Sequence, residues 1–214
     1  MKFILASASP DRKRLLELAL PFPITTIPSS FNESSIKITD PQLLALTLAK
    51  QKNQTVNQQL TDKTDTILLG SDTLVAFQNT IIGKAENKEH AREILSMLSG
   101  STHQLITAFY LLKTSPTEDE FSETVVTNVT MKPISDEEMD HYLAGTSWKN
   151  KAGAYGIQED AGKFIPKIDG CFLNVVGLPL CRIATKLASW GITLNTSAIK
   201  TECQRTGKMI CQIK

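Results

Sequence analysis

The sequence predicts an α/β protein, since short apolar runs typical of strands and capped amphipathic helices follow one another along its 214 residues. Residues 3–6 and 66–69 are apolar runs bounded by polar residues or glycine, as buried strands are. The dipeptides Ser9-Pro10 and Asp40-Pro41 combine an N-cap residue with a first-turn proline, which indicates that a helix begins at each. This length allows one large domain or two small lobes around a substantial core.

The later elements follow from local patterns. In chain order we expect a hairpin over residues 75–83, a helix over 88–98, strands over 103–114 and 125–131, a helix after the capping box at Ser135, a strand pair at 164–165 and 172–176, and a last helix through Leu187. Glycines punctuate residues 145–158, which predicts a folded loop. Beyond Leu194 the composition turns polar and basic, so we expect a domain over residues 1–194 and an appended tail over 195–214.

Composition excludes several classes of function. The 23 basic and 22 acidic residues give a net charge of +1, so no nucleic acid polymer is expected as a partner, and anion binding requires a local site. No apolar run approaches the roughly 18 residues of a membrane span, and the N-terminal run is too short for a signal peptide. The four cysteines form no CxxC pair and have no metal-ligand spacing with the histidines. We therefore expect a cytoplasmic protein with reduced thiols and no membrane partner.

Asp72 is the first candidate for chemistry. It follows the apolar run 66–69 and Gly70, and we expect it at the end of that strand. A carboxylate that a core strand carries to the rim of a site can bind a metal or act as a general base. The alternative is that Asp72 only caps a turn. Gly70 indicates either a turn or a close approach of another segment.

Other charged residues lie where they can meet an anion. Residues 11–14 fall in the first turn of a helix that follows a strand, where backbone N–H groups and the helix dipole favour phosphate, although a solvated charge run would look the same. Lys52 lies on the apolar stripe of the second helix, so it either snorkels to solvent or reaches into a cleft. Lys84 ends the return strand of the hairpin, and Glu33 lies in an irregular polar stretch.

Several catalytic signatures are absent from the sequence. It has no GxxxxGK[ST] loop, no GxGxxG fingerprint, no HExxH pair and no nucleophile elbow. His90, His103 and His141 are therefore expected to be structural or surface residues. The scattered cations and carboxylates that remain suit metal-assisted attack on a phosphate.

Six short motifs occur in order between residues 3 and 190. They are LASASPDR at 5–12, GSDT at 70–73, GK at 83–84, LSGSTH at 98–103, KAGAYGIQ at 151–158 and VGLP at 176–179. Together they resemble the signatures of the Maf family of nucleoside triphosphate pyrophosphatases. Six ordered matches are far more specific than any one of them.

The resemblance implies an elongated mixed β-sheet flanked by helices, with two lobes around a central cleft. It also implies a cytosolic enzyme, often a homodimer, that uses Mg²⁺ or Mn²⁺. Such an enzyme cleaves a nucleoside triphosphate between its α and β phosphates and releases monophosphate and pyrophosphate. Members of the family are regarded as housekeepers that remove surplus or non-standard nucleotides, and some are linked to septum formation.

The resemblance also assigns roles by motif position. Asp72 would be the catalytic base or a metal carboxylate, and Glu33 would support the metal or the water. Lys52 and Lys84 would neutralise the triphosphate. The remaining substrate-binding residues would be Ser7, Ser9, Asp11, Arg12, Thr73, Lys151 and Gln158.

Three of these positions sort substrates in the resembling family. Thr73 and Gln158 match the branch that acts on dTTP and UTP, whereas Asp11 stands where that branch has arginine. The amide of Gln158 can pair as donor and acceptor with a pyrimidine edge, and a carboxylate at position 11 can only accept. We therefore hypothesise that this enzyme tolerates cytosine-type bases, which carry an amino group, better than a typical member of that branch.

Two other functions remain open at this point. One is a nucleotide-binding regulator of cell division that has lost turnover, against which the presence of Asp72, Glu33, Lys52 and Lys84 argues. The other is purine-directed house-cleaning of the inosine-triphosphate type. A panel of nucleotides separates these possibilities.

Overall fold

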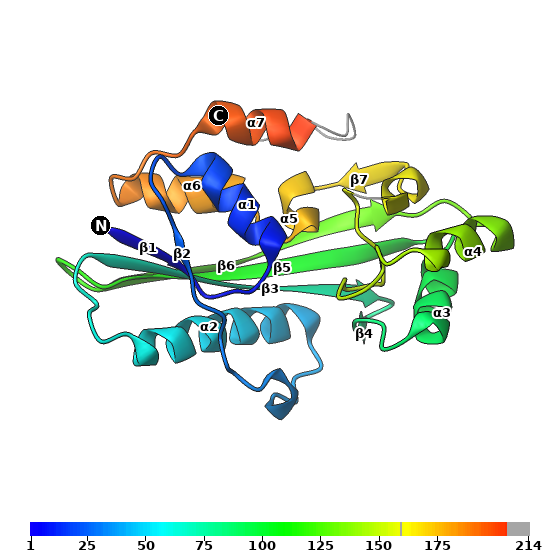
Figure 1. The fold of residues 1–214 in the computed structure, drawn as a ribbon, viewed down its shortest axis with the longest axis horizontal. Coiled ribbons are helices and arrows are strands. Elements are labelled where there is room, and N and C mark those ends of the chain that lie inside the picture. Colours follow the sequence, from blue (N-terminus) through cyan, green and yellow to red (C-terminus); the bar gives the residue numbers. More distant parts are fainter. Residues whose placement is uncertain (159, 205–214) are drawn as a thin grey trace.

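A computed structural model of the protein describes residues 1–158 and 160–204. These residues form a mixed seven-stranded sheet with helices on both faces (Figure 1), which confirms the predicted α/β class. The strands are β1 (Lys2–Leu5), β2 (Thr25–Thr26), β3 (Thr66–Phe77), β4 (Thr80–Ile82), β5 (Thr102–Lys113), β6 (Asp119–Thr130) and β7 (Lys167–Asp169). The α-helices are α1 (Pro10–Ala19), α2 (Pro41–Gln59), α3 (Lys88–Leu98), α4 (Asp136–Ala144), α5 (Phe172–Val176), α6 (Leu180–Ser189) and α7 (Thr196–Gln204). The 3-10 turns are η1 (Glu33–Ser35) and η2 (Asp160–Phe164).

The sheet has the strand order β2-β1-β3-β5-β6-β7, and β4 pairs with β3 outside this path. β1 is parallel to both β2 and β3, whereas β3, β5, β6 and β7 pair antiparallel. The long strands β3, β5 and β6 form the centre of the sheet, and the shorter strands lie around them. This topology places β1 beside the first half of β3, so the loop that follows β1 lies close to the middle of β3.

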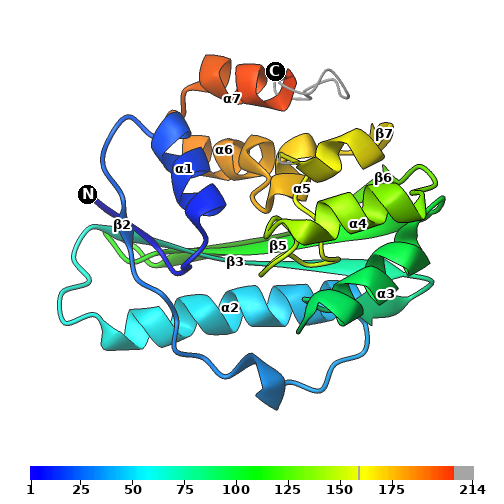
Figure 2. The same cartoon turned by 45° about the vertical axis from the view of Figure 1, so that its right-hand side comes forward.

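The helices lie in layers on the sheet. Helix α2 covers one face, and its Ala45, Ala49 and Val56 are buried against that face. On the other face lie α1, α5 and α6, with α7 outermost over α1 (Figures 1 and 2). Helices α3 and α4 lie at the opposite end of the sheet from α1 and α7. The body is elongated along the long strands, as the resemblance implied.

The predicted capping residues begin their helices. The Ser9 side chain accepts from the Arg12 backbone N–H at the start of α1, and Asp40 accepts from Leu43 at 2.7 Å at the start of α2. Ser135 forms the predicted capping box of α4. These bonds satisfy N–H groups that the first turn of a helix leaves without a partner.

The prediction that β3 ends near Gly70 and Asp72 is wrong. β3 continues for twelve residues through Gly70, with Asp72 in its middle. Gly70 marks a close approach instead of a turn, because a Cβ built there would lie 2.2 Å from the Ala49 carbonyl oxygen of α2. The glycine therefore lets α2 pack directly on the strand.

The strand pair predicted at 164–165 and 172–176 is also wrong. Residues 172–176 form the short helix α5, and β7 pairs with β6. Gly177, with φ 113°, ends α5 in the left-handed conformation, and the Leu178 N–H bonds to the Leu173 carbonyl at 2.9 Å, as in a Schellman cap. A five-residue apolar run cannot be identified as strand or helix by its pattern alone.

The predicted boundary at Leu194 is not the edge of the core. Residues 195–204 include α7, whose Ile199 and Cys203 are fully buried in the main apolar cluster. The Asn195 N–H bonds to the Ala19 carbonyl of α1 at 2.8 Å, which ties this segment to the body. Residues 205–214 of the predicted tail lie outside the described part of the chain.

Two sequence-based expectations concern thiols and membranes. Cys171 and Cys203 form no disulfide, Cys181 Sγ lies 4.0 Å from Cys203 Sγ, and Cys211 lies beyond the described residues. Among the helices of residues 1–158 and 160–204, none has the length and apolar character needed to cross a membrane.

Candidate active site

One cavity of about 920 Å³ brings the sequence-predicted site residues together. All of the predicted residues line it: Ser7, Ser9, Asp11, Arg12, Glu33, Lys52, Asp72, Thr73, Lys84, Lys151 and Gln158. Five basic side chains and three carboxylates line this cavity, so it is locally cationic although the whole chain is nearly neutral. Such a cavity favours an anionic ligand.

The cavity lies at an interruption in the pairing of β3. On one edge, β3 pairs with β1 over residues 66–69 and with β4 over residues 75–77. Among the described residues no strand pairs with residues 70–74 on that edge, whereas the other edge is paired with β5 throughout. Successive side chains of a strand point to opposite faces. Asp72 therefore lies on the α2 side and Thr73 on the α1 side, and the unpaired stretch lets one cavity contact both.

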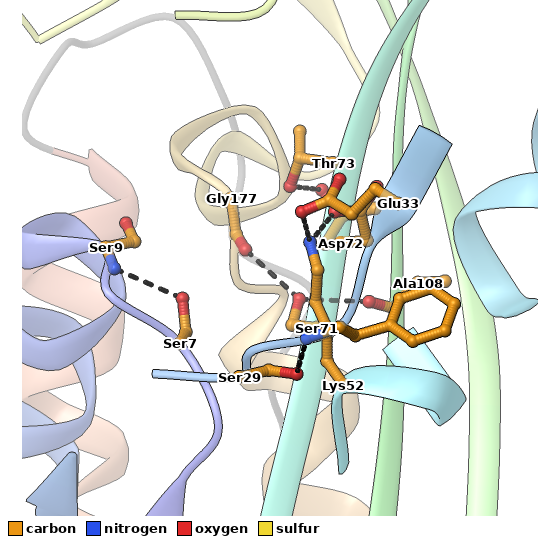
Figure 3. Close-up of polar contacts among 12 residues, drawn as sticks. Ser7, Ser9, Ser29, Glu33, Lys52, Ser71, Asp72, Thr73, Ala108 and Gly177 are labelled. Atoms are coloured by element: carbon orange, nitrogen blue, oxygen red, sulfur yellow. Dashed lines mark hydrogen bonds and ion pairs between the residues drawn. The ribbon is translucent and has the colours of Figure 1, made fainter. Parts of the chain in front are cut away.

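Lys52 joins two carboxylates in this cavity (Figure 3). Its Nζ lies 2.5 Å from Asp72 Oδ1 and 2.9 Å from Glu33 Oε1. The Lys52 and Asp72 side chains are only 13% and 8% exposed, whereas Glu33 is half exposed. Lys52 thus reaches from α2 into the cavity and does not extend to solvent, which were the two alternatives that the sequence left open. A charge-compensated carboxylate is also what allows Asp72 to be buried.

The second oxygen of Asp72 has no partner within the described part of the chain. Oδ2 is buried and makes no hydrogen bond, which is an unusual position for a carboxylate oxygen. No group of three acidic, histidine or cysteine side chains that could hold a metal occurs among these residues. Mg²⁺, however, is commonly held by one or two carboxylates together with substrate phosphates. The unpartnered oxygen and the neighbouring Glu33 fit that kind of site.

Arg12 is held in the wall of the cavity by four hydrogen bonds. Its guanidinium donates to the Gly177 carbonyl (2.9 Å), Ser7 Oγ (3.2 Å), the Ser71 carbonyl (2.9 Å) and Thr73 Oγ1 (2.8 Å). Burial lowers the pKa of Arg12, and the carboxylate of Asp72 partly opposes that effect. The Ser71 carbonyl lies in the unpaired stretch of β3, so the arginine replaces a missing strand partner. Arg12 therefore links α1, β3 and the end of α5, which form the wall of the cavity.

The loop between β1 and α1 forms one side of the cavity. The Ser9 N–H donates to Ser7 Oγ at 3.2 Å (Figure 3), and Ser7 is buried. The Ser9 hydroxyl accepts from the Arg12 N–H as the N-cap of α1. This loop therefore presents the N-terminus of a ten-residue helix to the cavity, where a helix dipole favours negative charge.

Lys84 faces the cavity from the end of β4. Its backbone forms an antiparallel bridge with Ala152, and the Gly153 N–H bonds to the Gly83 carbonyl at 3.2 Å. These bonds attach the loop of residues 145–158 to the hairpin. Within the described ranges Lys84 forms no ion pair, so its ammonium is available to an anion.

The three positions expected to sort substrates have defined partners. Lys151 Nζ lies 3.1 Å from Asp11 Oδ2, so the residue that departs from the family pattern is paired with another predicted site residue. Thr73 Oγ1 lies 3.0 Å from Thr107 Oγ1 on β5. Gln158 Nε2 donates to Glu202 Oε1 of α7 at 3.1 Å.

Sequence reasoning missed Thr107, Gly177 and Glu202 as parts of this region. Gly177 supplies its carbonyl to Arg12 because the cap of α5 turns the backbone toward β3. The sequence showed the Gly177 motif but not the helix that it ends. Glu202 was missed because α7 was read as part of a polar tail.

His103 and Tyr155 form a buried pair behind the cavity. His103 Nε2 lies 2.6 Å from the Tyr155 hydroxyl. Burial lowers the pKa of His103 to about 4 and raises the pKa of Tyr155. The imidazole is therefore neutral, and the pair links β5 to the loop of residues 145–158.

Comparisons with known proteins identify relatives of this chain. Residues 2–190 match the family described as "Maf-like protein". A dTTP/UTP pyrophosphatase from Bacillus anthracis is 38% identical over 89% of this chain and 96% of its own length. One from Agrobacterium fabrum is 37% identical over 91% of this chain and 95% of its own length.

Similarity to solved structures is weaker. A nucleoside-triphosphatase or dITP/XTP pyrophosphatase from Mycobacterium abscessus shares 15% identity with a TM-score of 0.39, covering 61% of this chain and 74% of its own. The family match and the two relatives each span most of the chain. This chain therefore belongs to the Maf-like protein family.

Proposed function

We propose that the protein is a nucleoside triphosphate pyrophosphatase that hydrolyses its substrate between the α and β phosphates. The observation that carries this proposal is Lys52 between Asp72 and Glu33, inside a cavity with an excess of basic side chains. The named activity of the relatives, dTTP/UTP pyrophosphatase, supports the same reaction. No comparison supports the alternative of a division regulator without turnover.

The residues divide the chemistry between them. Lys52 and Lys84 neutralise the triphosphate, and the N-terminus of α1 contributes further positive potential. Asp72 Oδ1 is held by Lys52, so Oδ2 is the oxygen left for the reaction, either as a metal ligand or as the acceptor of the proton of the attacking water. The water oxygen bonds to the α phosphorus, the bond from that phosphorus to the bridging oxygen breaks, and pyrophosphate leaves.

A divalent cation fits the same carboxylates. Asp72 and Glu33 would hold Mg²⁺ or Mn²⁺, and the ion would polarise the phosphate oxygens and neutralise developing charge. Lys52 already compensates both carboxylates, so the protein's own charge network holds them close together. The two carboxylates then face the phosphates as a pre-arranged pair.

Pyrimidine nucleotides are the proposed substrates. Thr73 and Gln158, the residues that match the dTTP and UTP branch, both line the cavity. The pairing of Asp11 with Lys151 leaves the second carboxylate oxygen able to accept from a base amino group. We therefore propose that CTP is turned over in addition to UTP and dTTP.

A nucleotide panel tests this proposal. UTP, dTTP, CTP, 5-methyl-CTP and ITP are incubated with the protein and Mg²⁺ or Mn²⁺, and pyrophosphate and monophosphate are quantified. We expect pyrophosphate from the pyrimidine nucleotides, with measurable turnover of CTP. Release of orthophosphate, or a preference for ITP, would contradict the proposed reaction or base. Activity on UTP and dTTP with none on CTP or 5-methyl-CTP would contradict the assignment of Asp11.

A further inference from the structure

Helix α7 reaches the candidate active site although it lies beyond the family match over residues 2–190. Its Glu202 is only 8% exposed. Glu202 Oε1 accepts from Arg14 Nη2 of α1 at 2.8 Å and from Gln158 Nε2 at 3.1 Å. A buried carboxylate on this helix is therefore charge-compensated by α1 and bonded directly to a side chain of the cavity.

The chemistry of this contact determines which way the Gln158 amide faces. An ionised carboxylate only accepts hydrogen bonds, and the two branches of an amide are a donor and an acceptor. The NH₂ branch must therefore face Glu202, because the reverse orientation would place two acceptor oxygens together. Gln158 lines the cavity, so its carbonyl branch is the one left for a ligand.

We propose that Glu202 is a positioning residue that orients Gln158 and makes the cavity selective for bases with an N–H at the contacted edge. Uracil and thymine carry such a group at N3, and cytosine carries one in the amino group at C4. This inference rests on the proposed function, since it concerns the base of the nucleotide. It assigns α7 a role in substrate choice.

The test compares UTP with 3-methyl-UTP, which lacks the N3–H. Replacing Glu202 by glutamine keeps the size of the side chain but allows either branch of Gln158 to face it. We expect Glu202→Gln to raise KM for UTP by about tenfold, in line with one lost hydrogen bond, while kcat stays the same. The KM for 3-methyl-UTP should not change, so the discrimination between the two nucleotides falls. A structural role alone would affect both nucleotides equally.

Two further variants control the experiment. Lys200→Gln changes an exposed residue of the same helix and should leave the discrimination unchanged. Gln158→Ala should abolish the discrimination between UTP and 3-methyl-UTP without changing α7. In a protein that carries Gln158→Ala, the further change Glu202→Gln should have no effect on KM for either nucleotide. Unchanged discrimination in Glu202→Gln, or an additive effect in the double variant, would overturn the inference.

Equilibrium binding separates this inference from the proposed function. Calorimetric affinities for UTP and 3-methyl-UTP do not depend on turnover. A wild-type protein that hydrolyses neither nucleotide but binds UTP more tightly, with Glu202→Gln removing the difference, would contradict the function and retain the inference. Wild-type binding without discrimination would overturn the inference directly.

Discussion

Arg12 connects three of the sequence motifs through one side chain. Its guanidinium bonds to Ser7 of its own motif, to Ser71 and Thr73 of the GSDT motif, and to the Gly177 carbonyl of the VGLP motif. Arginine suits this position because its planar group offers five donors in a fixed geometry. The spacing of these motifs along the chain thus reflects one buried hydrogen-bond network.

The first prediction concerns this network. Arg12→Lys keeps the charge but cannot make most of the four bonds, so buried acceptors lose their partner. We expect a loss of about 2–4 kcal/mol in the free energy of unfolding, measured by urea denaturation, together with loss of activity. Arg182→Lys, at an arginine side chain that is 59% exposed, is the matched control and should change stability by less than about 1 kcal/mol. Equal effects in the two variants would refute the role of Arg12.

The second prediction concerns Lys52. Lys52→Met removes the ammonium that lies between Asp72 and Glu33, and with it a charge expected to neutralise the triphosphate. We expect hydrolysis of UTP to slow by about 100-fold or more, as measured by pyrophosphate release. Lys50→Met alters a more exposed lysine two residues earlier and should stay within about twofold of the wild type. A similar rate in both variants would count against Lys52.

At the scale of elements, β3 and α2 pack backbone to backbone at Gly70. This contact places Lys52 of α2 beside Asp72 of β3. The close approach of the two elements is therefore part of the geometry of the site. It also explains why a strand of this length contains a glycine in its interior.

The third prediction tests that contact. A methyl group at position 70 would lie 2.2 Å from the Ala49 carbonyl oxygen, so α2 must move away from the sheet in Gly70→Ala. We expect a loss of about 2–4 kcal/mol in unfolding free energy, measured by urea denaturation. Gly83→Ala is the control, since nothing lies within 4 Å of a Cβ at that position. If both variants were equally stable, α2 would not pack as described.

The fourth prediction concerns the loop of residues 145–158, which the His103–Tyr155 pair ties to β5. The pKa of His103 is about 4 in the folded protein, below its ordinary 6.5, because burial disfavours the charged imidazole. Between pH 6.5 and 4 the unfolded chain therefore binds a proton that the folded protein does not. Keeping His103 neutral therefore contributes about 3 kcal/mol to the free energy of unfolding. This contribution is fully present above pH 6.5 and is lost as the pH falls toward 4.

Comparison with His103→Gln isolates this contribution, because carboxylates titrate in the same range. We expect the wild type to lose more unfolding free energy than His103→Gln when the pH falls from 7 to 4.5, as measured by urea denaturation at each pH. His141→Gln, at an exposed histidine, should behave like the wild type. If the unfolding free energies of the wild type and of His103→Gln changed with pH in the same way, the imidazole would not be buried in its neutral form.

Local signals in the sequence predicted much of this fold, whereas long-range packing decided the rest. The caps at Ser9, Asp40 and Ser135 begin helices because a hydrogen bond within the first turn needs no tertiary partner. The end of the strand at Asp72 and the strand at 172–176 were predicted wrongly, because the continuation of β3 under α2 and the buried helical turn of α5 depend on segments distant in sequence. The ordered motifs contain most of the candidate residues that line the cavity, whereas Glu33 and Lys52 lie outside those motifs, and the contact of Gln158 with Glu202 was not predicted.

At the scale of the whole molecule, the site forms where the pairing of the sheet is interrupted. Motifs from both ends of the body meet there, since Lys84 and the loop of residues 145–158 approach from one side and the loop of Ser7 and Ser9 from the other. The interruption at residues 70–74 exposes both faces of one strand to the same cavity. The proposed catalytic residue Asp72 and the proposed base-sorting residue Thr73 can thus be neighbours in sequence and still lie on opposite faces of the strand.

The most direct test of the proposed chemistry is pyrophosphate release from UTP with Mg²⁺ by the wild type and by Asp72→Asn. The substitution keeps the size of the side chain but removes the carboxylate whose Oδ2 has no partner among the described residues. We expect the rate to fall by about 10²–10⁴-fold, while Asp65→Asn, at an exposed aspartate just before β3, stays within about twofold of the wild type. An unchanged rate of pyrophosphate release in Asp72→Asn would contradict the role of Asp72 and the mechanism built on it.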